Sequence, residues 1–338
     1  MHEVAPRPVL AIDLGGTQIR AAHISPDRTI SCRRAVPTAD EEGTAAVIDR
    51  ICRLAGDVLE AARKQGLPPP VGVGISAPGP LDQRAGIVLY PPNLRGWRDV
   101  PLAALVEERL HLPTFLERDT NVAVMAEWRH GVAQGADDVI YVTVSTGIGG
   151  GIVVDGRPLI GKDGAAGEVG HLTVELDGPA CGDGAPGHAE AIGSGTGIER
   201  AARALLDQGA APGLAALIVN GQPVTAELVA RAADEGDRDC AMVMERAGVA
   251  LGAMLSGLVN VLNPEIIVIG GGIAEHRPQL FDIARAEIDR RSFARPAARV
   301  RLERPRFGSD VSLVGALPIV NERIQSAADG GHRSEEDL

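Results

Sequence analysis

Residues 9–20 read VLAIDLGGTQIR, and residues 139–154 read VIYVTVSTGIGGGIVV. In each stretch an apolar, β-branched run reaches a small polar residue, turns through glycines beside a threonine, and resumes as an apolar run. The pattern predicts a strand, a tight turn and a returning strand, present twice in the chain. Glycines let the main chain approach an anion, and successive backbone N–H groups in such turns form an anion-binding concavity. Two such turns indicate an enzyme that grips a polyphosphate, as a nucleotide-using phosphotransferase does.

Other nucleotide-binding motifs do not fit the sequence. A P-loop needs G-x-x-x-x-G-K-[S/T], and the chain has only two lysines, Lys64 and Lys162, neither of them in that context. Residues 72–77 imitate a dinucleotide fingerprint, but Pro78 and Pro80 stand where its helix should open. A single glycine turn would favour an ordinary β-hairpin. The repeat of the same design, with polar residues at matching places, favours phosphate binding.

The composition bounds the class of protein. With 338 residues the chain is long enough for two domains that share a cleft, and a hydrophobic content of 45% is ordinary for a globular protein. Aromatic residues make up 2%, which argues against platforms for base stacking. The net charge of −12 opposes binding to nucleic acid or to an anionic membrane.

Neither a leader nor a membrane anchor is expected. A strand begins by Val9, which leaves no room for a signal peptide, and the longest apolar stretch, 249–262, is interrupted and too short to span a bilayer. A disulfide framework is not expected either, because the cysteines are scattered. They stand at Cys32, Cys52, Cys181 and Cys240. These features predict a cytoplasmic enzyme.

Helical and strand patterns alternate along the rest of the chain. Helices are expected at 44–63, 102–110, 120–128, over much of 198–262, at 279–290 and at 314–324. Strands are expected at 71–75, 114–117, 265–269 and near Val300. The polar tail at 327–338 is expected to be disordered. Alternating strands and helices, together with the two glycine-turn hairpins, predict an α/β protein with mixed sheets.

A series of short motifs in order gives the chain a specific resemblance. The motifs are DLGGT at 13–17, APGP at 77–80, PNLxGW at 92–97, ExDxN at 117–121, STGIGGG at 145–151, GEVGH at 167–171, CG at 181–182, Glu190 and IGGG at 269–272. Together they resemble the ROK family (repressors, uncharacterised open reading frames and sugar kinases) from Val9 to about Ile324. The resemblance implies a two-domain actin-like ATPase fold, which is ribonuclease H-like, with mixed sheets flanked by helices and a cleft between the domains.

The resemblance also implies a division of the chain. The small α/β domain would comprise 1–118 plus about 314–326, and the large α/β domain 119–313, with a sugar and metal loop at 161–197. Family repressors carry a helix-turn-helix module ahead of the first glycine turn, whereas only eight residues precede Val9 in this sequence. A kinase is therefore expected rather than a regulator.

Asp119 is the candidate catalytic base. It lies where a predicted strand meets a predicted helix, so the competing interpretation is an aspartate that caps the helix, worth about 1 kcal/mol. The resemblance assigns it to accepting the proton of the sugar hydroxyl that attacks the γ-phosphate. Phosphoryl transfer needs mainly positioning and charge neutralisation, with one carboxylate to take that proton. The place of Asp119 between the two glycine turns favours catalysis.

Nucleotide and Mg²⁺ would be held by the glycine turns. Asp13 would hold Mg²⁺ through water, the alternative being a turn residue that bonds its own backbone. The residues expected at the nucleotide are Asp13, Gly15, Gly16, Thr17, Gln18, Thr146, Gly147, Gly195, Gly271 and Gly272. In the family a lysine often follows the threonine of the first turn, so Gln18 means that this charge is missing here.

By resemblance, the sugar would be bound by side chains and backbone that match hydroxyl donors and acceptors. These are Gly79, Asn93, Asp119, Glu168, His171 and Glu190. A site built on such bonds rejects isomers because buried groups would be left unpaired. Arg118 departs from the family, which commonly has Asn immediately before the catalytic Asp. Either Arg118 points to solvent or it changes which sugar fits, so the identity of the hexose stays open.

The loop at 161–197 holds a second departure. Many family members bind a structural zinc with one His and three Cys, and the matching positions here are His171, Cys181, Asp183 and His188. All four are residue types that bind Zn²⁺, and three of them lie on one short loop. Fewer thiolates mean weaker zinc binding, and Asp183 could instead stabilise a glycine-rich turn. Both interpretations stand.

The sequence thus predicts an ATP- and Mg²⁺-dependent hexose kinase, glucokinase-like, that phosphorylates the 6-hydroxyl of glucose and serves carbohydrate metabolism and glycolysis. The alternatives are a kinase for N-acetylmannosamine, fructose or allose, a non-catalytic sugar sensor of the ROK type, and a nucleotide-driven assembly protein like actin. Inorganic polyphosphate serves some relatives as donor, so the donor also stays open. Expected partners are a hexose and ATP, with no nucleic acid and no membrane, in a homodimer or homotetramer.

Overall fold

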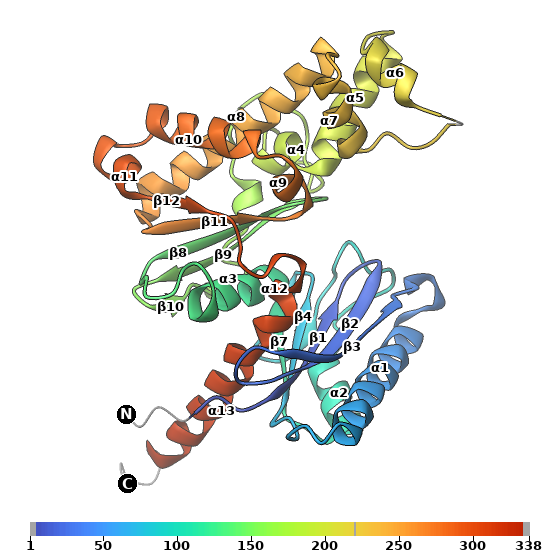
Figure 1. Cartoon of the computed structure of the whole chain (residues 1–338), viewed down its shortest axis with the longest axis vertical. Helices are drawn as coiled ribbons and strands as arrows, with labels where there is room; N and C mark the ends of the chain where they lie inside the picture. The colour runs from blue at the N-terminus through green and yellow to red at the C-terminus, as the bar shows by residue number, and fades with distance from the viewer. Residues whose placement is uncertain (1–4, 220, 334–338) are drawn as a thin grey trace. The chain divides into compact units, whose positions relative to one another are not determined.

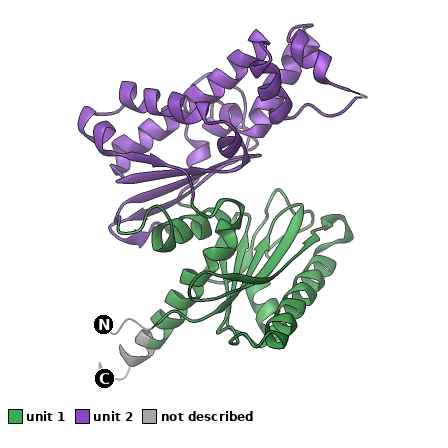
Figure 2. Cartoon of the chain, in the orientation of Figure 1, with its two compact units in different colours: residues 1–135, 160–166, 306–338 green, residues 136–159, 167–305 purple. Residues whose placement is uncertain are grey.

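The structure, a computed structural model, describes residues 5–219 and 221–333. The chain divides into two compact units, coloured green and purple in Figure 2. Unit 1 comprises Met1–Gly135, Ile160–Ala166 and Arg306–Leu338, and unit 2 comprises Ala136–Leu159 and Gly167–Pro305. Each unit is built around its own five-stranded sheet.

The sheet of unit 1 has the strand order β3-β2-β1-β4-β7. β1 pairs antiparallel with β2 and parallel with β4, and β4 pairs parallel with β7. The strands are β1 (Val9–Leu14), β2 (Gln18–Ile24), β3 (Ile30–Pro37), β4 (Val73–Ala77) and β7 (Thr114–Arg118), with a small ribbon of β5 (Leu81–Asp82) and β6 (Ile87–Val88). The first glycine turn joins β1 to β2, as the sequence pattern predicts.

Alternation along β1 builds a core on each face of this sheet. Leu10, Ile12 and Leu14 pack into a cluster with α1 (Thr44–Lys64) and α2 (Leu102–Leu110). Val9 and Ala11 point the other way, into a cluster with α12 (Val311–Val314) and α13 (Ala316–Arg333). Successive strand side chains face opposite sides, so a strand buried on both faces reads as a continuous apolar run. Figure 1 shows α1 and α13 on opposite sides of the sheet.

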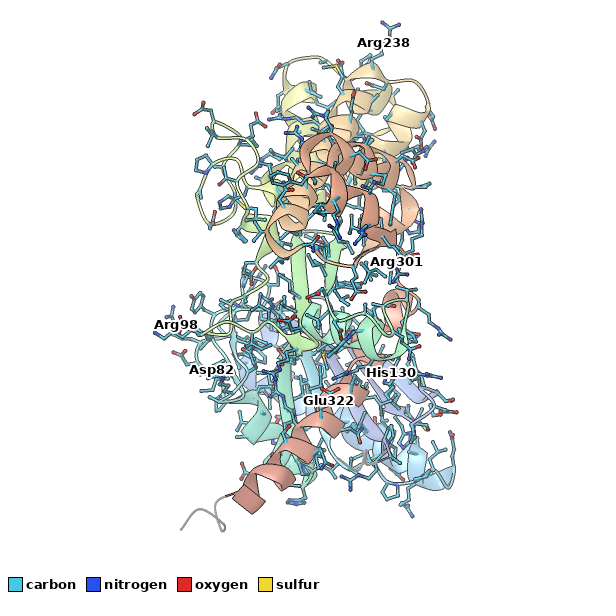
Figure 3. All side chains as sticks on the ribbon, turned by 90° about the vertical axis from the view of Figure 1, so that its left-hand side faces the viewer. Asp82, Arg98, His130, Arg238, Arg301 and Glu322 are labelled. Carbon is cyan, nitrogen blue, oxygen red and sulfur yellow. The ribbon has the colours of Figure 1, made fainter. Side chains whose placement is uncertain are left out.

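The C-terminal helix returns to unit 1 and differs from the expected disordered tail. α13 continues through 327–333 as helix, and the last five residues, 334–338, lie outside the described chain. Within the helix, the Ser326 hydroxyl donates to the Glu322 carbonyl, one turn earlier. Glu322, labelled in Figure 3 together with His130, also accepts from Arg129 at the end of α3 (Asp119–His130), 2.6 Å away. Packing of its first turns on the sheet stabilises the whole helix despite its polar end.

The boundary expected at 118/119 also differs from the observed division. Residues 119–135 belong to unit 1, because α3 packs against α12 and α13. Residues 306–313 join the same unit because α12 packs against α3, and the segment 160–166 also belongs to unit 1.

Unit 2 repeats the design with the strand order β10-β9-β8-β11-β12. The antiparallel pair β8–β9 carries the second glycine turn, and β11 runs parallel to both β8 and β12. The strands are β8 (Val139–Val144), β9 (Ile148–Val154), β10 (Arg157–Pro158), β11 (Ile266–Gly270) and β12 (Arg301–Glu303).

Helices cover one face of this sheet and extend from it. Apolar side chains of β8, β9 and β11 pack with α8, α10 and α11, and a further cluster joins α5, α6 and α7 to α8. Figure 1 shows α8, α10 and α11 on the same side of β8, β9 and β11. The helices are α4 (Ala189–Gly193), α5 (Gly195–Asp207), α6 (Pro212–Leu217), α7 (Ala226–Asp234), α8 (Arg238–Leu262), α9 (Gly272–His276), α10 (Gln279–Arg291) and α11 (Ala294–Arg299).

The helix α8 is longer than the apolar stretch that the sequence suggested. Among the described residues, it is the helix with the length and composition to cross a membrane, at a mean hydropathy of 1.4. In the fold, 56% of that window is buried inside the protein, where α8 packs against α10, α7 and α4. This burial is what a central core helix of a globular domain requires.

Candidate functional site

The first glycine turn is closed by backbone bonds. The N–H of Gly15 donates to the Gln18 carbonyl at 3.0 Å, and Thr38 on the neighbouring segment donates from its hydroxyl to the Gly15 carbonyl at 2.6 Å. Gly16 lies directly against Asn93, since an added Cβ would stand 3.0 Å from the Asn93 carbonyl oxygen. Thr17 and Gln18 are exposed at the tip. Unit 1 therefore brings a residue expected at the sugar next to the turn expected at the phosphates.

Asp13, expected to hold Mg²⁺, is engaged by Arg20. The Nε and Nη2 of Arg20 lie 2.9 Å and 2.6 Å from Asp13 Oδ2, across the β1–β2 pair. The guanidinium is itself held by the Ser312 hydroxyl at 3.0 Å and the Ser309 carbonyl at 2.7 Å. The arrangement anchors one carboxylate oxygen and fits an aspartate that acts on a hydrated cation through water. Sequence reasoning missed Arg20, although hairpin register would have placed it opposite Asp13.

Asp119 is the first residue of α3, directly after β7. Its Oδ1 accepts from the backbone N–H of Thr120 at 2.7 Å, so it satisfies one of the free N–H groups at the start of the helix. The residue in the capping position is Arg118, which makes no side-chain capping bond. Asp119 itself is exposed, and such exposure leaves a carboxylate within reach of a substrate.

A buried polar network lies beneath Asp119. Glu117 is 5% exposed, and its Oε1 accepts from the Asn121 amide at 2.9 Å, while its Oε2 accepts from Arg323 Nη2 on α13 at 2.6 Å. Gln83 donates to the same Oε1 at 3.4 Å. A satisfied buried network fixes the geometry of the elements that it joins. The end of β7 and the start of α3 are thus tied to the C-terminal helix.

Arg118 does not point to solvent, which was one of two expectations. It is 5% exposed, its stem packs against Gly79, and its Nη2 donates to the carbonyl of Ala166. Burial of an arginine is uncommon unless its guanidinium is paired. Arg118 is therefore a structural part of unit 1 and not a solvent-exposed surface residue.

The second glycine turn lies in unit 2 and is joined to α5. The Ser145 N–H donates to the Gly147 carbonyl at 2.9 Å, and the Gly195 N–H donates to the Ser145 carbonyl at 2.8 Å. The hydroxyl of Thr196 donates to the Thr146 carbonyl at 2.9 Å. The start of α5 is therefore bonded to the turn, which brings Gly195 beside Thr146 and Gly147.

Gly271, directly after β11, packs against the end of β8, where the second turn begins. Its φ is 95°, and an added Cβ would stand 2.5 Å from the Val144 carbonyl oxygen at the end of β8. Only glycine combines that left-handed backbone with so close an approach. Gly272 follows as the first residue of α9, with open space around it.

Glu190 links the second turn to Cys181, one of the four residues expected at a metal. Its Oε2 accepts from the Ile148 N–H at 2.8 Å, and the Cys181 thiol lies 3.6 Å from its Oε1. Gly147 is in contact with the same carboxylate, because an added Cβ would meet Oε2 at 2.5 Å. The sequence suggested a sugar ligand at this position, and the structure adds a support for the turn.

The four residues expected at a metal lie together in unit 2. One potential ligand atom from each of His171, Cys181, Asp183 and His188 lies within 4.8 Å of the others. The Nδ1 of His171 is 3.0 Å from Asp183 Oδ2, and the Nδ1 of His188 is 3.5 Å from the same oxygen. His188 is buried, and within the described part of the chain its Nδ1 has no hydrogen-bond partner.

The charges of this cluster are set by its neighbours. The backbone N–H of Ala185 lowers the pKa of Asp183, with further lowering by His171 and His188. Burial raises the pKa of the Cys181 thiol, and the nearby Glu190 carboxylate acts in the same direction. Glu168 precedes the short helix at Val169–His171 and is exposed. A carboxylate, two imidazoles and a thiol in such proximity form a donor set that fits Zn²⁺.

Two mixed sheets, each with a glycine turn between an antiparallel strand pair, define a protein of the actin-like ATPase fold. The sequence pattern of the ROK family matches residues 9–323, and the chain belongs to that family. Both the resemblance and the fold expected from the sequence are therefore confirmed.

Individual relatives span nearly the whole chain. The glucokinase of Thermotoga maritima is 34% identical over 316 residues, which cover 94% of this chain and 98% of that protein. The ROK hexokinase of Thermus thermophilus is 32% identical with a TM-score of 0.80, over 94% of this chain and 99% of that one. A ROK family glucokinase of Streptomyces griseus, solved in complex with glucose and AMPPNP, is 31% identical with a TM-score of 0.76, over 92% and 98%.

Proposed function

We propose that this chain is an ATP-dependent hexose kinase and that glucose, phosphorylated at its 6-hydroxyl, is the acceptor. The observation that carries the proposal is the joint presence of Asp119 at the start of α3 and of both glycine turns in a member of the ROK family. The similarity to two glucokinases and a hexokinase supports the choice of sugar.

In the proposed reaction, Asp119 accepts the proton of the 6-hydroxyl as the sugar oxygen attacks the γ-phosphorus. A bond forms between that oxygen and phosphorus, the bond to the β–γ bridging oxygen breaks, and ADP leaves. The exposed carboxylate of Asp119 on a rigid helix terminus supports this role, because general-base catalysis depends on fixed geometry. Mg²⁺, when bound, would neutralise phosphate charge, with Asp13 as the residue that holds it.

Phosphate binding is proposed for the backbone of the two turns. Thr17 and Gln18 in unit 1, and Thr146 with Gly147 in unit 2, stand at turns whose N–H groups suit phosphate oxygens. Gly195, Gly271 and Gly272 would form the nucleoside side, since they flank the second turn. Gly79, Asn93, Glu168, His171 and Glu190 would hold the sugar.

A coupled spectrophotometric assay tests the proposed function. Glucose, fructose, allose and N-acetylmannosamine are offered in turn with ATP and with inorganic polyphosphate, with and without Mg²⁺. We expect glucose with ATP and Mg²⁺ to give the highest kcat/KM. The D57N variant, which removes an exposed carboxylate on α1, serves as a control that retains activity. Absence of phosphotransfer to every sugar would overturn the proposal and favour a non-catalytic sensor.

We also propose that His171, Cys181, Asp183 and His188 bind one Zn²⁺. The proximity of their ligand atoms and the buried, unbonded Nδ1 of His188 support this assignment. Zinc at this place would orient His171 and fix the loop that carries Glu190, which is a supporting role. The metal would take no part in phosphoryl transfer.

Elemental analysis of the purified protein tests the zinc proposal. We expect close to one equivalent in the wild type and a clear loss in C181S, with C32S as the matched control because Cys32 is a free thiol outside the cluster. Less than about a tenth of an equivalent in the wild type after growth with zinc would refute the site. Cytoplasmic location and a homodimer or homotetramer complete the proposal, and light scattering decides the number of subunits.

A further inference from the structure

We propose that Arg118 is a positioning residue of the sugar-binding part of unit 1, where it ties the segment 160–166 to the end of β7. The inference deepens the proposed function and rests on it for the link to sugar binding. The tie itself is a separate structural claim about residues of one unit, so it can be tested without any catalysis.

Arg118 occupies a buried position at the end of β7, packed against Gly79. It is the last residue of β7 and pairs in register with Ala77 of the parallel strand β4. Its stem lies along Gly79, since a Cβ added there would stand 3.4 Å from Arg118 Cδ and 3.9 Å from Cγ. The side chain is 5% exposed, so the guanidinium is removed from water and must be held by protein groups.

The head of Arg118 reaches a segment far away in sequence. Its Nη2 donates to the Ala166 carbonyl and lies 3.5 Å from the Asn121 amide oxygen. Asn121 is in turn bonded to the buried Glu117. A hydrogen bond from a charged donor is worth about twice a neutral one, so this contact is a strong tie for an otherwise irregular segment.

The segment 160–166 contacts the rest of unit 1 at a second place, apart from the bond with Arg118. The Ala166 N–H donates to the Ile160 carbonyl at 3.1 Å, which closes the segment on itself. Gly164 is packed so tightly that an added Cβ would meet Gln83 Oε1 at 2.3 Å and the Leu81 carbonyl at 3.2 Å. The segment thus packs in one place on unit 1, and Arg118 supplies the charged hydrogen bond at its final residue, Ala166.

The consequence for sugar binding follows from chain order. Asp119, the proposed base, comes directly after Arg118, and Gly167 with the proposed sugar ligand Glu168 comes directly after Ala166. One buried side chain therefore joins the residue before Asp119 to the residue two positions before Glu168, next to two of the proposed sugar ligands. Loss of the tie should weaken sugar binding far more than nucleotide binding, because the printed bonds of Arg118 hold Ala166 and Asn121, whereas the two glycine turns are closed by backbone bonds of their own.

Two measurements on R118M, which keeps the stem and removes the donors, test the proposal. Amide hydrogen exchange over 160–168 should become faster, and the KM for glucose should rise at least about tenfold while the KM for ATP changes less than about twofold. R118K, which keeps one charged donor, should lie between R118M and the wild type in both readouts. The matched control is R129M, which removes another arginine of unit 1 whose Nε bonds Glu322 on α13, outside the Glu117 network.

The outcomes separate the two claims. Unchanged exchange over 160–168 in R118M would overturn the tie, and R118K serves in its place if R118M does not fold. An equal rise in the KM for glucose in R129M would show a general loss of order and would also overturn the inference. A wild-type chain that phosphorylates no sugar would refute the proposed function, while the exchange experiment would still decide whether Arg118 holds the segment.

Discussion

Replacing Gly147 by alanine should damage nucleotide binding through Glu190. The added Cβ would stand 2.5 Å from Glu190 Oε2, whereas real Cβ contacts essentially never fall below 3.0 Å. The carboxylate must therefore retreat by at least half an ångström. The bond that this retreat strains is the one from the Ile148 N–H, now 2.8 Å long. The second glycine turn then loses the hydrogen bond that Glu190 makes with it.

The size of the effect follows from the kind of bond. A hydrogen bond to a charged group contributes about 1.5–3 kcal/mol, and every 1.4 kcal/mol is a factor of ten. Glu190 is only half-buried, so the lower end applies and the affinity for nucleotide should fall about tenfold. Calorimetric titration with AMPPNP measures the change directly. G182A is the control, because a Cβ at Gly182 meets nothing within 4 Å.

A double variant isolates the cause. In an E190A background no carboxylate remains to be displaced, so adding G147A should change nucleotide affinity by less than about twofold. Independent, additive losses in the two backgrounds would contradict the proposed route through Glu190. Wild-type affinity in G147A alone would show that the second turn does not depend on this support.

Three further changes test the catalytic base, the packing and the charge balance. D119N should lower kcat by about 10²–10⁴-fold with nearly unchanged sugar and nucleotide affinity, and near-normal turnover in a coupled assay would refute the role of the base. G74A should cost about 1–3 kcal/mol in urea unfolding, because its Cβ would stand 2.8 Å from that of Ala316; an unchanged midpoint would contradict this packing. Arg290 and Arg291 lower the pKa of Glu287 below its ordinary 4.5, so the carboxylate stabilises the fold above that pH and loses this effect as the pH falls. The stability difference between wild type and E287Q, measured by thermal melts, should therefore be present at pH 7 and shrink below pH 4.5; a constant difference would contradict it.

Much of the fold follows from local patterns. The helix expected at 44–63 is Thr44–Lys64 in the structure, and the two glycine-turn hairpins lie where the sequence predicts them. Periodicity succeeds there because each element buries a regular face. The C-terminal helix escaped prediction beyond Ile324, since its polar end gives no periodic signal and its extension depends on packing of earlier turns.

The candidate site shows the same limit. Resemblance grouped His171, Cys181, Asp183 and His188, and the structure brings them together, while metal binding itself stays a prediction. The bond from Arg118 to Ala166 could not be read from the chain, because it joins residues far apart through an irregular segment. Only tertiary folding reveals such a contact.

The return of the chain end to unit 1 has a consequence for synthesis. α12 and α13 cover the face of the first sheet that carries Val9 and Ala11, yet they come after the whole of unit 2 in the chain. All of unit 2 is synthesised before them, so the strands β1 and β2 have one apolar face uncovered until α12 and α13 are made. Prematurely terminated chains should consequently be substrates for chaperones and proteases, since their first sheet is never covered.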